Sequence, residues 1–146
     1  MKNPTLIIVL AFAASGCNFL SGEPSDNSMN SYIEGYNELI DGPSDFARRC
    51  LSAFPEGGPA PGKKYRMMLM VSSAQNDLNA AKRAFEQGDE SSEIGKFATQ
   101  AATSMGTVMR ACKNIDGYYD AEDYKDDKDG TKVKAMYDEA LGAFKE

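Results

Sequence analysis

Apolar residues recur along most of this chain at spacings of three and four, which predicts α-helices with one buried face. The first row starts at Met29, and Ser28 is placed to cap the helix. Asp41-Gly42-Pro43 then interrupts the pattern, because Gly favours a helix end and Pro the first turn of a new helix. The apolar positions of this first row are Tyr32, Ile33, Tyr36, Leu39 and Ile40.

A second apolar face follows, with Phe46, Cys50 and either Ala53 or Phe54. The pattern leaves open whether the region is two helices or one kinked helix. Residues 55–62, rich in Pro and Gly, predict a loop.

The next helix is expected to begin near Lys63 and to end at Gly88-Asp89, which also caps its successor. Its apolar row steps by three and four. The row contains Met68, Val71, Gln75, Leu78, Ala81 or Lys82, and Phe85, widened by Tyr65 and Leu69.

The most regular row predicts a long helix from Ser91 to Tyr119, about 45 Å in length. Gly95 and Gly106 cost about 1 kcal/mol each inside a helix, so we expect them to permit close approach of a neighbouring helix. The row is nearly a heptad seam. It consists of Ile94, Phe97, Ala101, Met105, Val108, Cys112, Ile115 and Tyr119.

A last helix is expected from Thr131, after a charged turn. No alternating apolar pattern is long enough for a sheet. The predicted fold is therefore all-α, an elongated antiparallel bundle of three to four helices with short loops. The apolar side of the last helix contains Val133, Met136 or Tyr137, Ala140 and Phe144.

The chain opens with features typical of a bacterial lipoprotein. Lys2 precedes an apolar run, Leu6 to Ala14, that is too short to cross a bilayer, and the run ends at Ala14-Ser15-Gly16-Cys17. This resemblance to lipoprotein signals implies cleavage after residue 16, a thioether-linked lipid on Cys17 and a second acylation (palmitate) on its new amino group. Two acyl chains anchor a protein stably, whereas one does not.

Three segments follow: a signal peptide (1–16), a flexible tether (17–28) rich in Ser, Gly, Asn and Asp, and a helical domain (29–146). Asn18 follows the lipidated cysteine where Asp would favour inner-membrane retention. We therefore expect an exported protein anchored to the cell envelope, with the outer membrane favoured.

The net charge and the residue composition exclude several classes of function. The net charge is −6, and it would become −7 with loss of the signal peptide and Lys2, which argues against a nucleic-acid partner. The chain has no His, so the Ser-His-Asp and Cys-His nucleophile systems are excluded within it. We expect no catalytic residues, no metal ligands and no cofactor.

Cys50 and Cys112 remain once Cys17 carries lipid. An oxidising compartment favours a disulfide between them, which would close a loop of about 63 residues and contribute about 4 kcal/mol. The alternative is two separate buried thiols.

The densest polar stretch runs from Tyr118 to Gly130. A calcium loop aligned on Gly130 would require oxygen ligands where Lys125 and Met136 stand, so an EF-hand is disfavoured. A solvated helix end is the simplest interpretation, and a polar binding surface is the functional one. Its candidate residues are Tyr118, Tyr119, Asp120, Asp123, Tyr124, Asp126 and Asp127.

Two blocks resemble the YiiG-like lipoproteins: Ser31 to Ile40, which contains Tyr-Ile-Glu-Gly-Tyr-Asn-Glu-Leu, and Tyr118-Tyr119 followed by Asp123-Tyr124-Lys125-Asp126-Asp127. The resemblance covers about Met29 to Phe144 and implies a helical domain with a lipoprotein signal and without an assigned activity. Members of that family continue further, so the resemblance implies that this chain corresponds to the N-terminal part.

Three functions compete. The first is a non-enzymatic, membrane-anchored module that binds a partner or scaffolds the envelope. The second is a metal-binding or small-ligand-binding lipoprotein, and the third is a hydrolase using Asp120, Asp123, Asp126 or Asp127. Uncovered apolar faces would favour self-association or a partner helix. The expected docking positions are Met67, Met70, Val108 and Met136.

Overall fold

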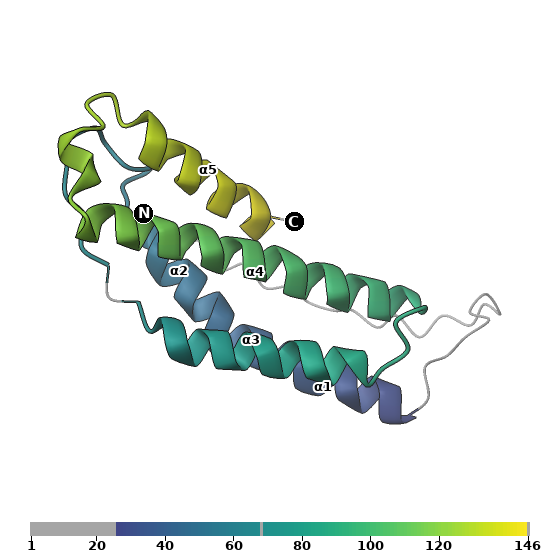
Figure 1. Ribbon diagram of the computed structural model, residues 1–146. Helices are drawn as coiled ribbons and strands as arrows, with labels where there is room; N and C mark the ends of the chain where they lie inside the picture. Colours follow the sequence, from purple (N-terminus) through teal and green to yellow (C-terminus); the bar gives the residue numbers. More distant parts are fainter. Residues whose placement is uncertain (1–25, 68, 146) are drawn as a thin grey trace, which may run out of the picture.

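The computed structural model describes residues 26–67 and 69–145, and all of its regular structure there is helical (Figure 1). The predictions for the signal peptide, Cys17 and Met68 lie outside the described residues. The all-α prediction is confirmed. The elements in order are α1 (Asp26–Leu39), the π-helical η1 (Ile40–Ser44), α2 (Asp45–Ser52), α3 (Val71–Glu86), α4 (Glu93–Asp120), the 3-10 turn η2 (Asp123–Lys125) and α5 (Thr131–Lys145).

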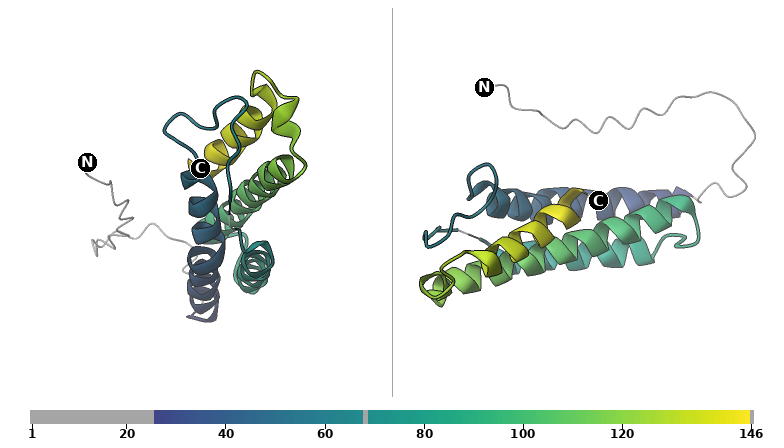
Figure 2. Two further views of the ribbon diagram at one scale, coloured as in Figure 1. Left: turned by 90° about the vertical axis from the view of Figure 1, so that its left-hand side faces the viewer. Right: turned by 90° about the horizontal axis from the view of Figure 1, so that it is seen from above.

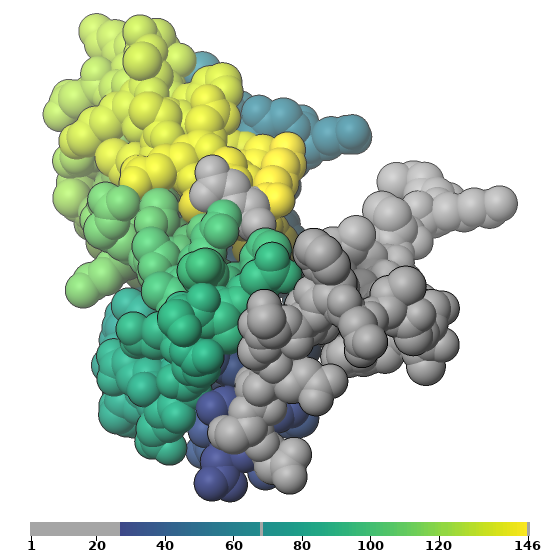
Figure 3. All heavy atoms as spheres, turned by 90° about the vertical axis from the view of Figure 1, so that its right-hand side faces the viewer, coloured from purple at the N-terminus to yellow at the C-terminus, as the bar shows by residue number. Residues whose placement is uncertain are grey.

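The bundle is elongated and is built around α4, the longest helix described (Figures 1 and 2). The helix α3 runs antiparallel to both α1 and α4, and α5 returns antiparallel along α4. The helices α3 and α5 lie on different sides of α4, with α5 at one edge of the molecule (yellow in Figure 3). The N-terminal half of α4 therefore packs against α1 and α3, and its C-terminal half against α2 and α5.

The segments α1, η1 and α2 form one continuous helix, which answers the question that the sequence left open. Pro43 has no N–H to donate to the carbonyl of Leu39, four residues earlier. The hydroxyl of Ser44 donates to that carbonyl instead, at 2.8 Å. The helix therefore passes through Asp41-Gly42-Pro43 as a π-helical turn, with Pro43 buried.

The buried face of α1 differs from the prediction. Tyr32 and Leu39 are buried, but Ile33, Tyr36 and Ile40 are about half exposed. A Cβ added at Gly35 would lie 2.4 Å from the Phe85 ring, so α1 meets α3 at a glycine. The apolar row predicted from the sequence therefore lies partly outside the contact between α1 and α3.

The start of α3 was expected near Lys63 and lies at Val71. Tyr65 explains the longer connection. Its ring packs 5.0 Å from that of Phe54 and 5.8 Å from that of Tyr119, between ring centroids, and its hydroxyl accepts a hydrogen bond from the Ala60 N–H at 3.2 Å. These contacts with distant residues hold the segment outside a helix.

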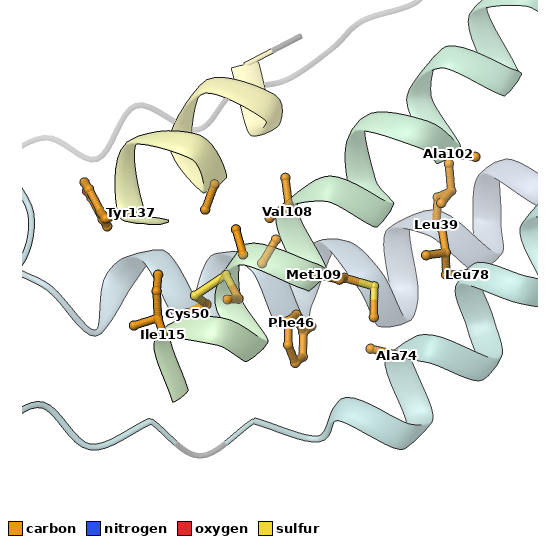
Figure 4. Packing of buried hydrophobic residues seen from close by; sticks show 14 of the residues in the cluster. Leu39, Phe46, Cys50, Ala74, Leu78, Ala102, Val108, Met109, Ile115 and Tyr137 are labelled. Carbon is orange, nitrogen blue, oxygen red and sulfur yellow. A yellow bond between two sulfur atoms is a disulfide. The ribbon is translucent and has the colours of Figure 1, made fainter. Parts of the chain in front are cut away.

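The core contains the Cys50–Cys112 disulfide, which confirms the predicted bridge (Figure 4). Both cysteines are fully buried, and the bond joins α2 to the C-terminal half of α4. Ile115 and Phe46 lie close to it in Figure 4. Of the predicted docking positions, Val108 is wrong because it is fully buried, whereas Met70 is 73% exposed.

The two glycines of α4 have different roles. A Cβ at Gly95 would lie 2.2 Å from the backbone oxygen of Asp89, whereas a Cβ at Gly106 would make ordinary contact with Leu78, at 3.7 Å. We expect Gly95→Ala to lower the free energy of unfolding by about 2 kcal/mol, because the turn before α4 must move. Gly106→Ala should raise it by up to about 1 kcal/mol.

Urea denaturation of the two variants beside the wild type measures this difference. Equal effects of the two substitutions would contradict it, since both change the same helix by one methyl group.

Candidate functional site

The tyrosines of the predicted binding surface are mostly internal. Tyr118 and Tyr119 at the end of α4 are each 3% exposed, and Tyr124 is half-buried. They belong to an aromatic cluster that sequence reasoning did not assemble, because its other members come from the connection after α2 and from α5. Ring contacts link Tyr118, Tyr119 and Tyr124 with Phe54, Tyr65 and Tyr137.

Asp127 joins the end of α4 to the start of α5. Its carboxylate accepts a hydrogen bond from the Tyr118 hydroxyl at 2.9 Å. It also accepts from the backbone N–H groups of Lys132 and Val133, at 3.4 and 3.3 Å, which belong to the first turn of α5. Helix N-termini leave such N–H groups without partners in the helix, so Asp127 acts as a cap for α5.

Lys132 closes the same connection from the other side. Its ammonium pairs with the carboxylate of Asp123 and lies 5.7 Å from the centroid of the Tyr118 ring. We call Tyr118, Asp123, Asp127 and Lys132 the clasp. Its role is to hold α5 against α4 after the reversal of the chain.

Two predicted acids lie outside the clasp. Asp120 and Asp126 are exposed, and among the described residues no hydrogen bond of their side chains joins either of them to the clasp. The structure therefore brings five of the seven candidates into structural contacts: Tyr118, Tyr119, Asp123, Tyr124 and Asp127. The sequence did not predict that Lys132 and Tyr65 belong to this region, because only their proximity in three dimensions places them there.

Burial changes the acidity of the two adjacent tyrosines. It raises the pKa of Tyr118, and the hydrogen bond to Asp127 raises that pKa further. Burial, followed by the nearby Tyr65 and Asp127, raises the pKa of Tyr119 to about 12. The Tyr119 hydroxyl is buried and has no hydrogen-bond partner among the described residues.

The two tyrosines should respond differently to loss of the hydroxyl. We expect Tyr118→Phe to lower the free energy of unfolding by about 2 kcal/mol, because it removes a hydrogen bond to a carboxylate. Tyr119→Phe should change it by less than about 0.5 kcal/mol, or stabilise the protein, because it removes an unpaired buried group. Urea denaturation at pH 7 tests the pair, and equal losses would contradict the assignment.

Tyr119 should also make the protein sensitive to alkali. Its pKa is about 12 in the folded state and near 10 in an unfolded chain, so its contribution is complete below pH 10 and is lost as the pH rises through 12. At pH 11.5 the loss would be about 2 kcal/mol. Comparing the free energies of unfolding of the wild type and Tyr119→Phe at pH 9 and 11.5 separates the effect of Tyr119 from lysine titration. An identical pH dependence of the two proteins would contradict the prediction.

Other features of the described part carry less chemistry. No three acidic or cysteine side chains there are grouped as a metal site requires, and none of its helices is long and apolar enough to cross a membrane. A surface groove of about 660 Å³ lies between the start of α3 and α4. Its lining comprises Leu69, Val71, Ser72, Gln75, Gly106, Met109, Arg110 and Lys113.

One known family matches all of the described residues. A family described as a protein of unknown function, DUF3829, matches residues 23–146. The chain belongs to the DUF3829 family. No curated protein and no solved structure matches it. Membership therefore places the domain among proteins without an assigned activity and supplies no site residues.

Proposed function

We propose that this DUF3829 protein is a lipid-anchored bacterial envelope protein that acts by binding a partner, and that it is not an enzyme. The sequence around Cys17 supports the anchor: a short apolar run, small residues and a cysteine precede a polar segment and then the folded domain. The narrower YiiG-like assignment belongs to this proposal and fits the same features.

The exposed apolar surface of α4 and α1 supports the binding role. Phe97 is 71% exposed and Ile33 is 53% exposed, although each stands on a helix that packs against other helices through a neighbouring face. Clusters of exposed apolar side chains on a folded domain mark interaction surfaces.

The positions of the acidic side chains support binding over carboxylate catalysis. Asp127 caps α5, and Asp123 is paired with Lys132. A hydrolase would need two carboxylates across a concave site with one pKa raised. Asp116 is the described acid with a raised pKa, from burial and the nearby Asp120, and it lies on α4 outside the clasp.

The intact mass of the protein extracted from membranes tests the anchor. We expect a mass that begins at Cys17 with acyl chains added, and a Cys17→Ser chain that leaves the membrane fraction. A mass that retains residues 1–16, in a protein that stays membrane-bound after Cys17→Ser, would overturn the proposal.

Small-ligand binding is the second candidate, and the groove beside α3 favours it. Its lining includes the apolar side chains of Leu69 and Met109, and Lys113 and Arg110 add positive charge, although Arg110 also pairs with Glu139 at 2.7 Å. A thermal melt with added fatty acid, calcium or ferric citrate tests it, because a bound ligand raises the midpoint with its concentration. An unchanged midpoint with all three argues against this function.

A further inference from the structure

One face of α4 is covered along half of its length only. In the C-terminal half, Val108 and Ile115 on this face are fully buried. In the N-terminal half, Ile94 is 38% and Phe97 is 71% exposed, and Ala101 is exposed as well. Because these positions step by three and four residues, they form one row along the helix. The row thus changes from buried to exposed without a change in its apolar character.

The described part of α5 is shorter than α4. The helix α4 has 28 residues, about 42 Å, and α5 has 15, about 22 Å. Figure 1 shows α5 lying along the C-terminal half of α4 and ending near its middle. About 20 Å of the face continues beyond Lys145, the last described residue of α5, and this is the length of a helix of about 13 residues.

The helix α1 borders this uncovered length. It packs against α4, and the Tyr32 hydroxyl donates to the backbone oxygen of Asp89 at 2.6 Å, just before α4 begins. Seen from above, α1 and α4 continue side by side beyond the end of α5 (Figure 2). We call the two exposed rows the open seam. It consists of Ile33, Tyr36 and Ile40 from α1 with Ile94, Phe97 and Ala101 from α4.

The charge beside the seam indicates what would cover it. Glu34, Asn37 and Asp41 form an exposed row one position over from the apolar row of α1. From Asp26 to Asp41 the chain has four acidic residues and no Lys or Arg, and Asp45, which follows, is paired with Arg48 and Arg49. The corresponding edge of α4 carries both signs of charge, with Glu93, Lys96 and Gln100 exposed and Ser104 half-buried. An occupant would therefore meet negative charge along α1.

We propose that the open seam binds a basic amphipathic helix of about 13 residues from another protein, with its apolar face on the seam and its cations beside α1. The proposal rests on the binding role proposed above and names the surface and the class of partner. Helix-in-groove recognition uses apolar anchors at this spacing. Complementary charge selects the partner, and a second copy of this chain, at net charge −6, would bring another acidic α1.

The test uses the mature chain with Cys17→Ser, which needs no detergent. Two synthetic 14-residue helical peptides serve as probes: both carry the same leucine row, one flanked by lysines and the other by glutamates. We expect fluorescence anisotropy to show at least tenfold tighter binding of the lysine peptide at 50 mM NaCl, with a smaller difference at 500 mM NaCl. Phe97→Glu should weaken that binding at least tenfold.

Met70→Glu is the matched control. Met70 is 73% exposed but precedes α3, near the covered half of the bundle, so its substitution should leave peptide binding unchanged. Circular dichroism and urea denaturation establish that Phe97→Glu remains folded, and Phe97→Ala supplies a second seam variant.

Three results would overturn the proposal. They are equal affinity for the two peptides, binding that survives both Phe97 substitutions, and no binding of either peptide at 1 mM. A concentration-dependent dimer that Phe97→Glu dissociates would assign the seam to a second copy instead. The lipid anchor is tested separately, by the intact mass and membrane fractionation of the protein with Cys17. Failure of the peptide-binding experiment therefore does not bear on the proposed anchor.

Discussion

Removal of the Cys50–Cys112 disulfide is expected to lower the free energy of unfolding by about 4 kcal/mol. The cysteines are 62 positions apart, and a cross-link over such a loop restricts the unfolded chain strongly. Both side chains are fully buried, so Cys50→Ala with Cys112→Ala also loses some packing. The bond joins α2 to the C-terminal half of α4, so its loss should loosen the packing of these two helices.

Thermal and urea unfolding of the double alanine variant, in a Cys17→Ser background, measure this effect. The midpoint temperature should fall on the order of 15 °C. Reductant should lower the wild-type midpoint to a similar extent and leave the variant unchanged. A loss below 1 kcal/mol, or equal sensitivity of both proteins to reductant, would contradict the expectation.

The row on α4 shows what periodicity can predict. Spacings of three and four correctly placed Phe97, Val108 and Ile115 on one face of a long helix. They could not predict that, of these three residues, only Val108 and Ile115 are buried, because burial depends on the length and path of another helix, α5. The sequence predicts which residues share a face, and tertiary packing decides how much of that face is buried.

The errors in α1 and α3 have identifiable physical causes. Gly35 does not count as apolar, yet the absence of a side chain lets Phe85 pack against α1 there. Tyr65 fits a helical row, but its contacts with Phe54 and Tyr119 hold it in an irregular segment. In both places a contact between distant parts of the chain outweighs the local pattern.

The candidate site was predicted in its residue types and in its order, but only partly in its role. The dense run of tyrosines and acids coincides with the connection between α4 and α5, and its prediction as a binding surface stays a prediction. Asp127 caps α5 because Val133, in the first turn of that helix, is six residues away in sequence and its N–H lies within hydrogen-bond distance. Sequence alone does not distinguish an acid that binds a ligand from one that caps the next helix.

Substitution of Leu78 by alanine should be nearly as damaging as loss of the disulfide, at about 3–4 kcal/mol. Leu78 on α3 is 1% exposed, and Figure 4 shows it meeting Leu39 of α1 and Ala102 of α4. It lies where α1, α3 and α4 pack without help from α5. A cavity at this place would therefore weaken the half of the bundle that bears the open seam.

Urea denaturation of Leu78→Ala, Leu78→Met and Ile33→Ala separates packing from exposed surface. Leu78→Met keeps the volume and should cost less than about 1.5 kcal/mol. Ile33 is 53% exposed, so Ile33→Ala should cost less than about 1 kcal/mol. If Ile33→Ala were as costly as Leu78→Ala, the seam would already be packed in the free protein, and no surface would remain there for a partner helix.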